Sequence, residues 1–266
     1  DEEHLLFHTS NRLSAFDINI CEIPYKGQVL NRISSWWFNK TKDLVPNHLI
    51  SLDGNNNMKV KKCKPILIEF VVRGYITGES KTSMWKNYND GERKYCGHTL
   101  PEGLIKNQVL NVPLVTPTTK GKKDELISSE EIIKREILTE EQWNQCEKYA
   151  LDLFNCGQMI ADENGLILVD TKYEFGFDEN DDIILIDELH TPDSSRYWLK
   201  HTYNLNSYQN HENIDKEIVR KWIKNNYDPY NRDIKIEVTD EMKNLLMKRY
   251  IQLYEILTNE IFFDFI

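Results

Sequence analysis

Leu168-Val169-Asp170-Thr171-Lys172-Tyr173-Glu174-Phe175-Gly176 is the stretch that decides the fold, because it supplies one arm of a predicted β-hairpin. A second apolar segment at 183–189 follows the polar residues Asp178-Glu179-Asn180-Asp181-Asp182. Two such segments joined by a short polar turn indicate antiparallel strands, here at 166–175 and 183–189.

Charged side chains converge on one face of this hairpin. Alternation along the first strand puts Asp170, Lys172 and Glu174 on the same side. With the turn centred near residue 180, Asp187 lies roughly opposite Lys172 and diagonal to Glu174. Two carboxylates about 4 Å apart repel by roughly 1 kcal/mol in water and about 4 kcal/mol at an effective dielectric of 20. Lys172 neutralises one charge and Mg²⁺ is the natural counterpart for the others; the alternative is a solvated face whose charges bind nothing.

Two other segments carry groups that suit an anionic ligand. The turn Thr191-Pro192-Asp193-Ser194-Ser195-Arg196 holds a bidentate guanidinium and two serine hydroxyls, which suit a phosphate or carboxylate. Arg73 follows a predicted strand at 66–72, which Pro65 starts, and precedes Gly-containing chain where backbone can approach a ligand. Each arginine alone also fits an ordinary surface ion pair.

A helical region lies between the two predicted strand regions. Ser128 with Glu131, and Thr139 with Gln142, fit the capping box, in which side chains satisfy free N–H groups at a helix start. Beyond them, apolar and small residues at helical spacing predict one buried stripe. The stripe consists of Trp143, Cys146, Ala150, Leu153, Phe154 and Gly157.

The remaining elements set the fold class. Segment 53–64 reads as a polar surface turn leading into the 66–72 strand, and two C-terminal helices are expected at roughly 215–225 and 240–257. Strands and helices alternate without a regular βαβ rhythm. The expected class is therefore α+β with mainly antiparallel sheets.

Composition excludes several kinds of partner. The net charge of −10 over 266 residues disfavours binding to a phosphate backbone, so no nucleic acid is expected. No apolar run approaches the roughly 20 residues of a spanning helix, so no membrane is expected. Five scattered cysteines without a Cys-x-x-Cys pair favour reduced thiols and a cytoplasmic location. The sequence does not distinguish a monomer from a homo-oligomer.

Five segments together resemble the signatures of the SAICAR synthetase family. They occur in the family's order, the resemblance spans most of the chain, from about residue 5 to 257, and the combination is highly specific. The segments are Ser14-Ala15-Phe16-Asp17, Val71-Val72-Arg73-Gly74-Tyr75-Ile76-Thr77-Gly78, Thr116-Pro117-Thr118-Thr119-Lys120, the hairpin arm quoted above, and Asp187-Glu188-Leu189-His190-Thr191-Pro192-Asp193-Ser194-Ser195-Arg196-Tyr197-Trp198.

The resemblance implies an ATP-dependent, amide-forming carbon–nitrogen ligase of de novo purine biosynthesis. Such an enzyme joins L-aspartate to carboxyaminoimidazole ribonucleotide (CAIR), giving SAICAR, ADP and phosphate. ATP phosphorylates the imidazole carboxylate, and the aspartate amine then attacks the acyl phosphate. Phosphoryl transfer of this kind depends mainly on positioning and charge neutralisation, which implies ATP and Mg²⁺ as cofactors.

The same resemblance assigns roles to single residues. Glu174 and Asp187 are expected to hold Mg²⁺ at the ATP phosphates, with Lys172 and Lys120 as nearby cations and Asp170 orienting Lys172. The expected catalytic residues are therefore Lys172, Asp170 and Lys120.

Further residues are expected to bind the two nucleotides. The adenine is expected near 62–66, so the expected ATP contacts are Lys62, Cys63, Pro65, Lys120, Glu174 and Asp187. The expected contacts of the imidazole nucleotide are Arg73, Ser83, Asp193, Ser195, Arg196, Lys216 and Arg220. Ser80 is the alternative to Ser83 for the substrate phosphate; Ser83 is preferred because the following Met84-Trp85 restores the family pattern.

The family fold is a two-lobed α+β arrangement related to ATP-grasp and kinase-like architectures. It predicts a small ATP-binding lobe at 1–75 and a larger lobe with the metal and substrate site at 76–266. The family usually begins with a Gly- and Lys-containing flap over the ATP phosphates, and we expect this flap to be absent from this sequence or disordered. No motif isolates the residues that bind aspartate.

Two other functions compete with the ligase. A phosphotransferase of similar fold would phosphorylate a small molecule without joining aspartate, and its ADP release would not depend on both substrates. A noncatalytic ATP-binding module would bind ATP normally and form no product.

Overall fold

The computed structural model describes residues 3–121, 124–208, 211–231 and 233–265. The strands are β1 (His4–His8), β2 (Arg12–Ala15), β3 (Ile18–Glu22), β4 (Leu49–Leu52), β5 (Asn57–Lys61), β6 (Lys64–Tyr75), β7 (Lys94–Tyr95), β8 (His98–Thr99), β9 (Val109–Val115), β10 (Thr118–Thr119), β11 (Leu166–Phe177), β12 (Ile183–Ile186) and β13 (Ser195–Leu199). The helices are α1 (Lys26–Thr41), α2 (Met84–Asn89), α3 (Ser129–Lys134), α4 (Glu140–Glu163), α5 (Glu217–Asn226) and α6 (Asp240–Thr258), with short 3₁₀ turns at Lys200–Thr202 and Phe262–Phe265.

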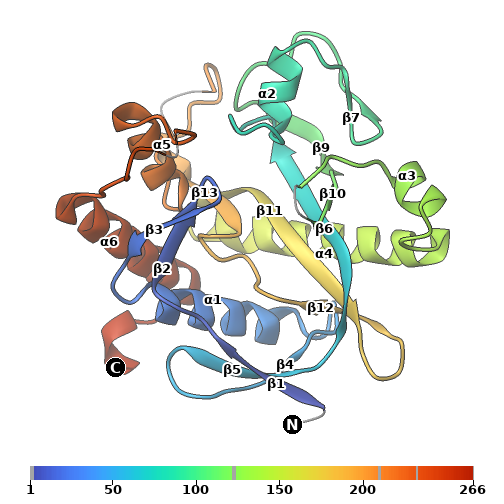
Figure 1. Cartoon of the computed structure of the whole chain (residues 1–266), viewed down its shortest axis with the longest axis horizontal. Helices are drawn as coiled ribbons and strands as arrows, with labels where there is room; N and C mark the ends of the chain where they lie inside the picture. Colours follow the sequence, from blue (N-terminus) through green and yellow to red (C-terminus); the bar gives the residue numbers. More distant parts are fainter. Residues whose placement is uncertain (1–2, 122–123, 209–210, 232, 266) are drawn as a thin grey trace.

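A central sheet of six strands carries the long strands β6 and β11 side by side (Figure 1). Its order is β10-β6-β11-β12, with β9 also pairing with β6 and β13 also pairing with β11. All of these pairings are antiparallel, as is the smaller sheet β1-β5-β4. The predicted α+β class with mainly antiparallel sheets is confirmed.

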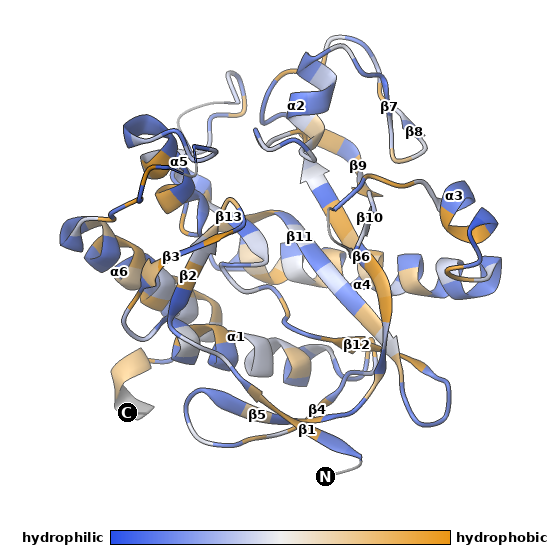
Figure 2. Cartoon of the chain, in the orientation of Figure 1, coloured by the Kyte–Doolittle hydropathy of each residue, from blue (hydrophilic) through white to orange (hydrophobic). Residues whose placement is uncertain are grey.

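Alternation along β6 separates the core from the site. Ile66, Ile68, Phe70 and Val72 are buried on the side that α4 covers, and the ring of Phe70 stacks on Trp143 with centroids 5.4 Å apart. Figure 2 shows the resulting mixture of apolar and polar residues along the strand. The intervening residues are therefore free to line a cavity on the opposite face.

The predicted stripe of α4 is buried as expected, and both predicted helix starts are present. Thr139 forms the complete capping box with Gln142 at the start of α4. Ser128 accepts the backbone N–H of Glu131 at the start of α3, while the Glu131 carboxylate pairs with Arg135 at 2.8 Å. At the start of α3, therefore, only the Ser128 half of the predicted capping box is formed.

The hairpin is present, but its register is displaced by one residue from the prediction. Glu174 pairs with Ile186, so continuation of the ladder would set Asp187 opposite Tyr173 instead of Lys172. β12 ends at Ile186 rather than at residue 189, because Asp187 has a left-handed backbone with φ of 68° that turns the chain away.

Two predictions for the N-terminal part need correction. Segment 53–64 is not one polar turn: Asn57–Lys61 forms β5, in which Met58 and Val60 alternate into the core. The helix α1 was not predicted, although Ile33, Trp37 and Phe38 bury one of its faces and it packs against α6. The proposed lobe boundary falls at the end of β6, and the division into 1–75 and 76–266 stays a prediction.

The C-terminal helices begin and end close to the expected positions, at Glu217–Asn226 and Asp240–Thr258. Within the described ranges, no helix combines the length and apolar character that crossing a bilayer requires.

Candidate functional site

A cavity of about 1030 Å³ lies over the face of β6 and β11 that α4 does not cover. Its floor includes Glu69 and Arg73 from β6 and Asp170 and Lys172 from β11. Its walls come from the loop at 79–83, the turn at 193–196 and the start of α5. The two longest strands of the protein thus bring charged groups from distant parts of the sequence to one place.

Lys172 is the centre of an ionic cluster on this floor. Its Nζ lies 3.0 Å from Glu174 Oε1, 3.3 Å from Glu69 Oε1 and 3.6 Å from Asp187 Oδ2. Lys120, which follows β10, forms a second ion pair with the buried Glu174. The predicted convergence of Lys172, Glu174, Asp187 and Lys120 is therefore observed, with three carboxylates against two ammonium groups.

The cluster shifts the pKa values of its members in opposite directions. Burial alone would lower the pKa of Lys172, but Asp187, Glu174 and Glu69 raise it above its ordinary value. Burial would raise the pKa of Glu174, yet Lys172 and Lys120 hold it below the usual range. For Asp187, burial and the Glu174 carboxylate leave the pKa raised. At Asp187, burial and the repulsion from Glu174 thus outweigh the attraction of Lys172 and Lys120.

The donor set fits a hard divalent cation. Glu174 and Asp187 offer carboxylate oxygens, which are the ligands that hard cations prefer. The described residues contain no group of three or more His, Cys, Asp or Glu side chains arranged to hold a metal. Mg²⁺ usually takes only one or two carboxylates and completes its shell with water and substrate phosphates, so a pair suffices.

Asp170 holds two arginines at the other end of the floor. It pairs with Arg73 of β6 on one side and Arg196 of β13 on the other, both directly opposite in the strand register. Arg73 Nη1 lies 3.4 Å from Asp170 Oδ2, and Arg196 forms an ion pair with the same oxygen. The expectation that Asp170 orients Lys172 is therefore wrong: its ion-pair partners among the described residues are the two arginines.

The loop after β6 folds a buried serine toward the arginines. Ser83 Oγ accepts the backbone N–H of Ser80 at 3.1 Å and lies 2.6 Å from Ser80 Oγ. Gly78 has φ of 91°, and a Cβ there would lie 2.4 Å from Ser83 Oγ and 3.2 Å from Arg196 Nη2. A glycine at position 78 is therefore required for this loop conformation. Ser80 and Ser83, which the loop carries, both line the cavity.

Asp193 joins three helices beneath the cavity. Its carboxylate lies 2.9 Å from Lys26 Nζ of α1 and 3.2 Å from Lys216 Nζ at the start of α5, and it accepts the Tyr250 hydroxyl of α6 at 2.6 Å. Burial would raise the pKa of Asp193, but Lys216 and Lys26 lower it to about 2. Asp193 and Lys216, both predicted to contact the substrate, line the cavity, and they also bond to each other in this junction.

The other predicted substrate contacts also line the cavity. Ser195 is buried, and its Oγ lies 2.7 Å from Thr171 Oγ1. Arg220 is partly exposed, with Nη1 lying 3.6 Å from Glu217 Oε2. Both residues belong to the wall that carries Arg196.

The predicted adenine contacts lie at the far end of β6. Pro65 pairs with Gly176 of β11, and Lys62 and Cys63 precede β6. None of the three is among the described residues that line the large cavity. At about 3.3 Å per residue, Pro65 is roughly 13 Å from Glu69 and roughly 26 Å from Arg73 along the strand.

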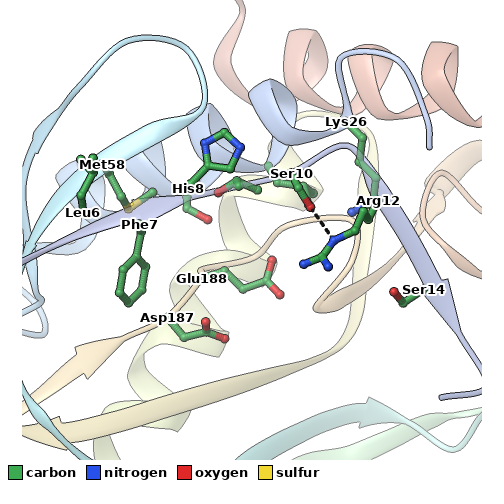
Figure 3. A pocket seen from close by; sticks show the side chains of 13 residues that line it. Leu6, Phe7, His8, Ser10, Arg12, Ser14, Lys26, Met58, Asp187 and Glu188 are labelled. Atoms are coloured by element: carbon green, nitrogen blue, oxygen red, sulfur yellow. Dashed lines mark hydrogen bonds between the residues drawn. The ribbon is translucent and has the colours of Figure 1, made fainter. Parts of the chain in front are cut away.

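A second cavity, of about 460 Å³, adjoins the first between β1, β2 and α1 (Figure 3). Arg12, Lys26 and Asp187 line it, and Glu188 lines both cavities. Glu188 accepts the Thr191 hydroxyl, and burial together with Asp187 and Asp193 raises its pKa to about 7. The Glu188 side chain thus lies where the two cavities meet.

Sequence reasoning missed several charged residues of this region, Arg12 among them. Glu69 could have been found, because alternation puts it on the same face of β6 as Arg73, opposite the buried Ile68 and Phe70. Nothing in the sequence indicated a role for Lys26, which begins the unpredicted helix α1. Glu188 was noted beside Asp187, but a single sequence does not show that it lies between the two cavities.

Comparison with known proteins gives consistent results. The sequence model of the SAICAR synthetase family matches residues 1–237. A phosphoribosylaminoimidazole-succinocarboxamide synthase from Legionella pneumophila (strain Paris) is 49% identical over 263 residues, covering 98% of this chain and 84% of the relative.

Solved structures agree with the sequence matches. A SAICAR synthase from Saccharomyces cerevisiae complexed with SAICAR superposes with a TM-score of 0.84 at 32% identity, covering 98% of this chain and 90% of that one. A SAICAR synthetase in complex with ADP superposes with a TM-score of 0.73 at 25% identity, covering 98% and 93%.

Proposed function

Because this chain belongs to the SAICAR synthetase family, the ATP-dependent ligases of purine biosynthesis that make SAICAR from CAIR and L-aspartate, we propose that both of its substrate nucleotides bind along β6 and β11. In this proposal, the cluster around Lys172 receives the ATP phosphates and the arginines beside Asp170 receive CAIR. Mg²⁺ is the proposed metal, held by Glu174 and Asp187.

The reaction sets the requirements for such a site. A CAIR carboxylate oxygen attacks the γ-phosphorus of ATP, the bond to the β-phosphate oxygen breaks, and ADP leaves. The aspartate nitrogen, after its ammonium loses a proton, attacks the acyl carbon; the carbon–oxygen bond to phosphate breaks, and a second N–H proton is lost as the amide forms. Both steps need charge neutralisation and alignment rather than a protein nucleophile.

The residues of the cluster supply charge neutralisation at the transferred phosphoryl group. Mg²⁺ bound there would neutralise phosphate oxygens and fix their orientation. Lys172 and Lys120 already neutralise Glu174, and we propose that both turn part of their charge to the phosphates when the nucleotide arrives. As preorganised cations, they would stabilise the charge that develops during transfer.

The opposite end of the floor has the composition of a nucleotide monophosphate site. Arg73 and Arg196 are bidentate donors fixed by Asp170, and we propose that they bind CAIR together with Ser83. Ser83 remains preferred over Ser80 because it is buried and bonds to the Ser80 backbone. The proposed CAIR contacts are completed by Asp193, Ser195, Lys216 and Arg220.

One observation carries this assignment: Lys172 and Asp170 lie two residues apart on the same face of β11, one among carboxylates and the other between arginines. With this spacing, the proposed metal–phosphate region would lie roughly 7 Å from the proposed anion-binding region. The CAIR carboxylate would then face the γ-phosphate. The adenine would lie toward Lys62, Cys63 and Pro65, at the far end of β6.

ADP release tests the proposal against a phosphotransferase and a noncatalytic module. The purified chain is mixed with ATP and Mg²⁺, and CAIR and L-aspartate are added singly and together. We expect sustained ADP release only with both, together with a product of the mass of SAICAR. Release with CAIR alone at the same rate would favour the phosphotransferase, and nucleotide binding without release would favour the noncatalytic module.

A cytoplasmic location and the two lobes are also part of the proposal. The cysteines of the described residues, Cys21, Cys63, Cys96, Cys146 and Cys156, are all free thiols, which supports a reducing compartment.

A further inference from the structure

The second cavity has one apolar and one charged end. Leu6, Phe7 and Met58 line one side, whereas Ser10 and Arg12 line the other (Figure 3). Its position beside Asp187 and Glu188 puts the charged end next to the proposed reaction centre. The apolar end resembles a surface for a flat or aliphatic group, and the charged end suits a small anion.

Alternation along β2 directs Arg12 into this cavity. Leu13 and Ala15 are buried in the core, so Arg12 and Ser14 emerge on the other face and line the cavity. Arg12 Nε donates to Ser10 Oγ at 3.1 Å, which orients the guanidinium. No carboxylate of the described residues forms an ion pair with Arg12, so its two terminal nitrogens remain available for a bidentate anion.

Lys26 and Glu188 complete the charges around the cavity. Lys26 is buried and shares one ion pair with Asp193, which leaves further N–H donors on its ammonium group. Glu188 offers carboxyl oxygens at the junction of the two cavities. With Asp187 assigned to the metal, two cationic groups and the Glu188 acceptor match a molecule with two carboxylates and an ammonium group.

We propose that Arg12 binds a carboxylate of L-aspartate in the second cavity, with the amino group of the substrate directed to Glu188. Lys26 lies on the same wall and is the second cation available to the dicarboxylate. The nitrogen would then enter the large cavity where the acyl phosphate forms. This inference rests on the proposed function and adds the third substrate to it.

Arg12 and Lys26 could also bind phosphate oxygens of the nucleotide. The experiment therefore separates binding of the nucleotide phosphates from binding of the aspartate carboxylates. The variants are Arg12→Gln and the conservative Arg12→Lys. Arg135→Gln is the matched control, because Arg135 pairs with Glu131 on the exposed surface of α3. Steady-state ADP release gives the KM of each substrate, and calorimetry gives the affinities for ADP and for succinate, a dicarboxylate without the ammonium group.

We expect Arg12→Gln to raise the KM for aspartate at least tenfold, equivalent to about 1.4 kcal/mol, and to weaken succinate binding similarly. The KM for CAIR and the ADP affinity should change less than twofold. Arg12→Lys should recover part of the loss, because it restores the charge without the bidentate geometry. Since Arg12 is exposed on β2, the variants should fold like the parent protein.

Three results would overturn the inference. Weaker ADP binding with an unchanged aspartate KM would assign Arg12 to the nucleotide. A lower kcat with every KM unchanged would exclude binding of aspartate by Arg12. The same conclusion would follow if the KM for aspartate, the KM for CAIR and the ADP affinity were all unchanged. If the parent protein shows no turnover but binds succinate through Arg12, the proposed function fails while the dicarboxylate site stands.

Discussion

Replacing Asp187 with Asn separates a metal ligand from a structural ion pair. Asp187 lies 3.6 Å from Lys172 Nζ, and Glu174 together with burial raises its pKa. At an effective dielectric of 20, a charge pair about 4 Å apart interacts by about 4 kcal/mol. Glu174 repels the same carboxylate and opposes this attraction, and solvent at the partly exposed Asp187 side chain screens both, so we expect a net contribution of about 1 kcal/mol or less.

Asp187→Asn should consequently leave the metal-free fold almost unchanged. A free-energy change of about 1 kcal/mol corresponds to a Tm shift of about 2–4 °C in a protein of this size. Turnover should nevertheless fall at least about 100-fold, the effect of removing one group that stabilises developing charge. The assays are ADP release at saturating substrates and thermal unfolding with and without ADP and Mg²⁺, which should stabilise the parent but not the variant.

Asp152→Asn is the matched control, because Asp152 pairs with Lys148 at 2.6 Å on the surface of α4, away from both cavities. It should preserve turnover and Tm. Turnover of Asp187→Asn within threefold of the parent would refute the metal assignment. A Tm loss above about 8 °C in the metal-free protein would show instead that Asp187 is a structural residue.

Three further predictions concern the substrate end of the cavity and the helix junction beneath it. Gly78→Ala should cost about 1–3 kcal/mol in urea unfolding and raise the KM for CAIR, because the backbone has φ of 91° and the new Cβ would lie 2.4 Å from Ser83 Oγ; unchanged stability and KM would contradict the loop geometry. Arg196→Ala should raise the KM for CAIR more than tenfold at unchanged ADP affinity, and an unchanged KM would reduce this residue to a structural ion pair. Asp193 has a pKa lowered to about 2, so its ionised form stabilises the fold above its ordinary pKa of about 3.9, and this stability is lost as pH falls toward 2. Urea unfolding should therefore show a stability difference between the parent and Asp193→Asn that shrinks from pH 7 to pH 3, whereas a constant difference would argue against the ionic junction.

Local patterns were sufficient to predict the hairpin, the buried stripe of α4 and the part of the ionic cluster that the hairpin carries. Period-two alternation identifies the faces of β11, and the helical repeat from Trp143 to Gly157 identifies the face of α4. Both patterns depend on neighbours in sequence. The convergence of Lys172 with Glu174 and Asp187 followed from hairpin geometry, even though the register differed by one residue.

Long-range pairings were beyond this reasoning. Asp170 lies between Arg73 and Arg196 because β6 and β13 flank β11, and no local pattern specifies which strands become neighbours. The junction of Asp193 with Lys26, Lys216 and Tyr250 likewise depends on α1, α5 and α6, which are distant in sequence. The second cavity also brings together strands and a helix that are distant in sequence. This explains why no motif revealed a site for aspartate.

The central claim is that the carboxylates of the hairpin hold a divalent cation at the phosphates of ATP. A crystal grown with ADP and Mn²⁺ tests it directly through the anomalous signal of the metal. The prediction is a peak between Glu174 and Asp187, with the diphosphate beside Lys172 and the adenine toward Pro65. Nucleotide and metal bound elsewhere, with Lys172 still paired to both carboxylates, would contradict it.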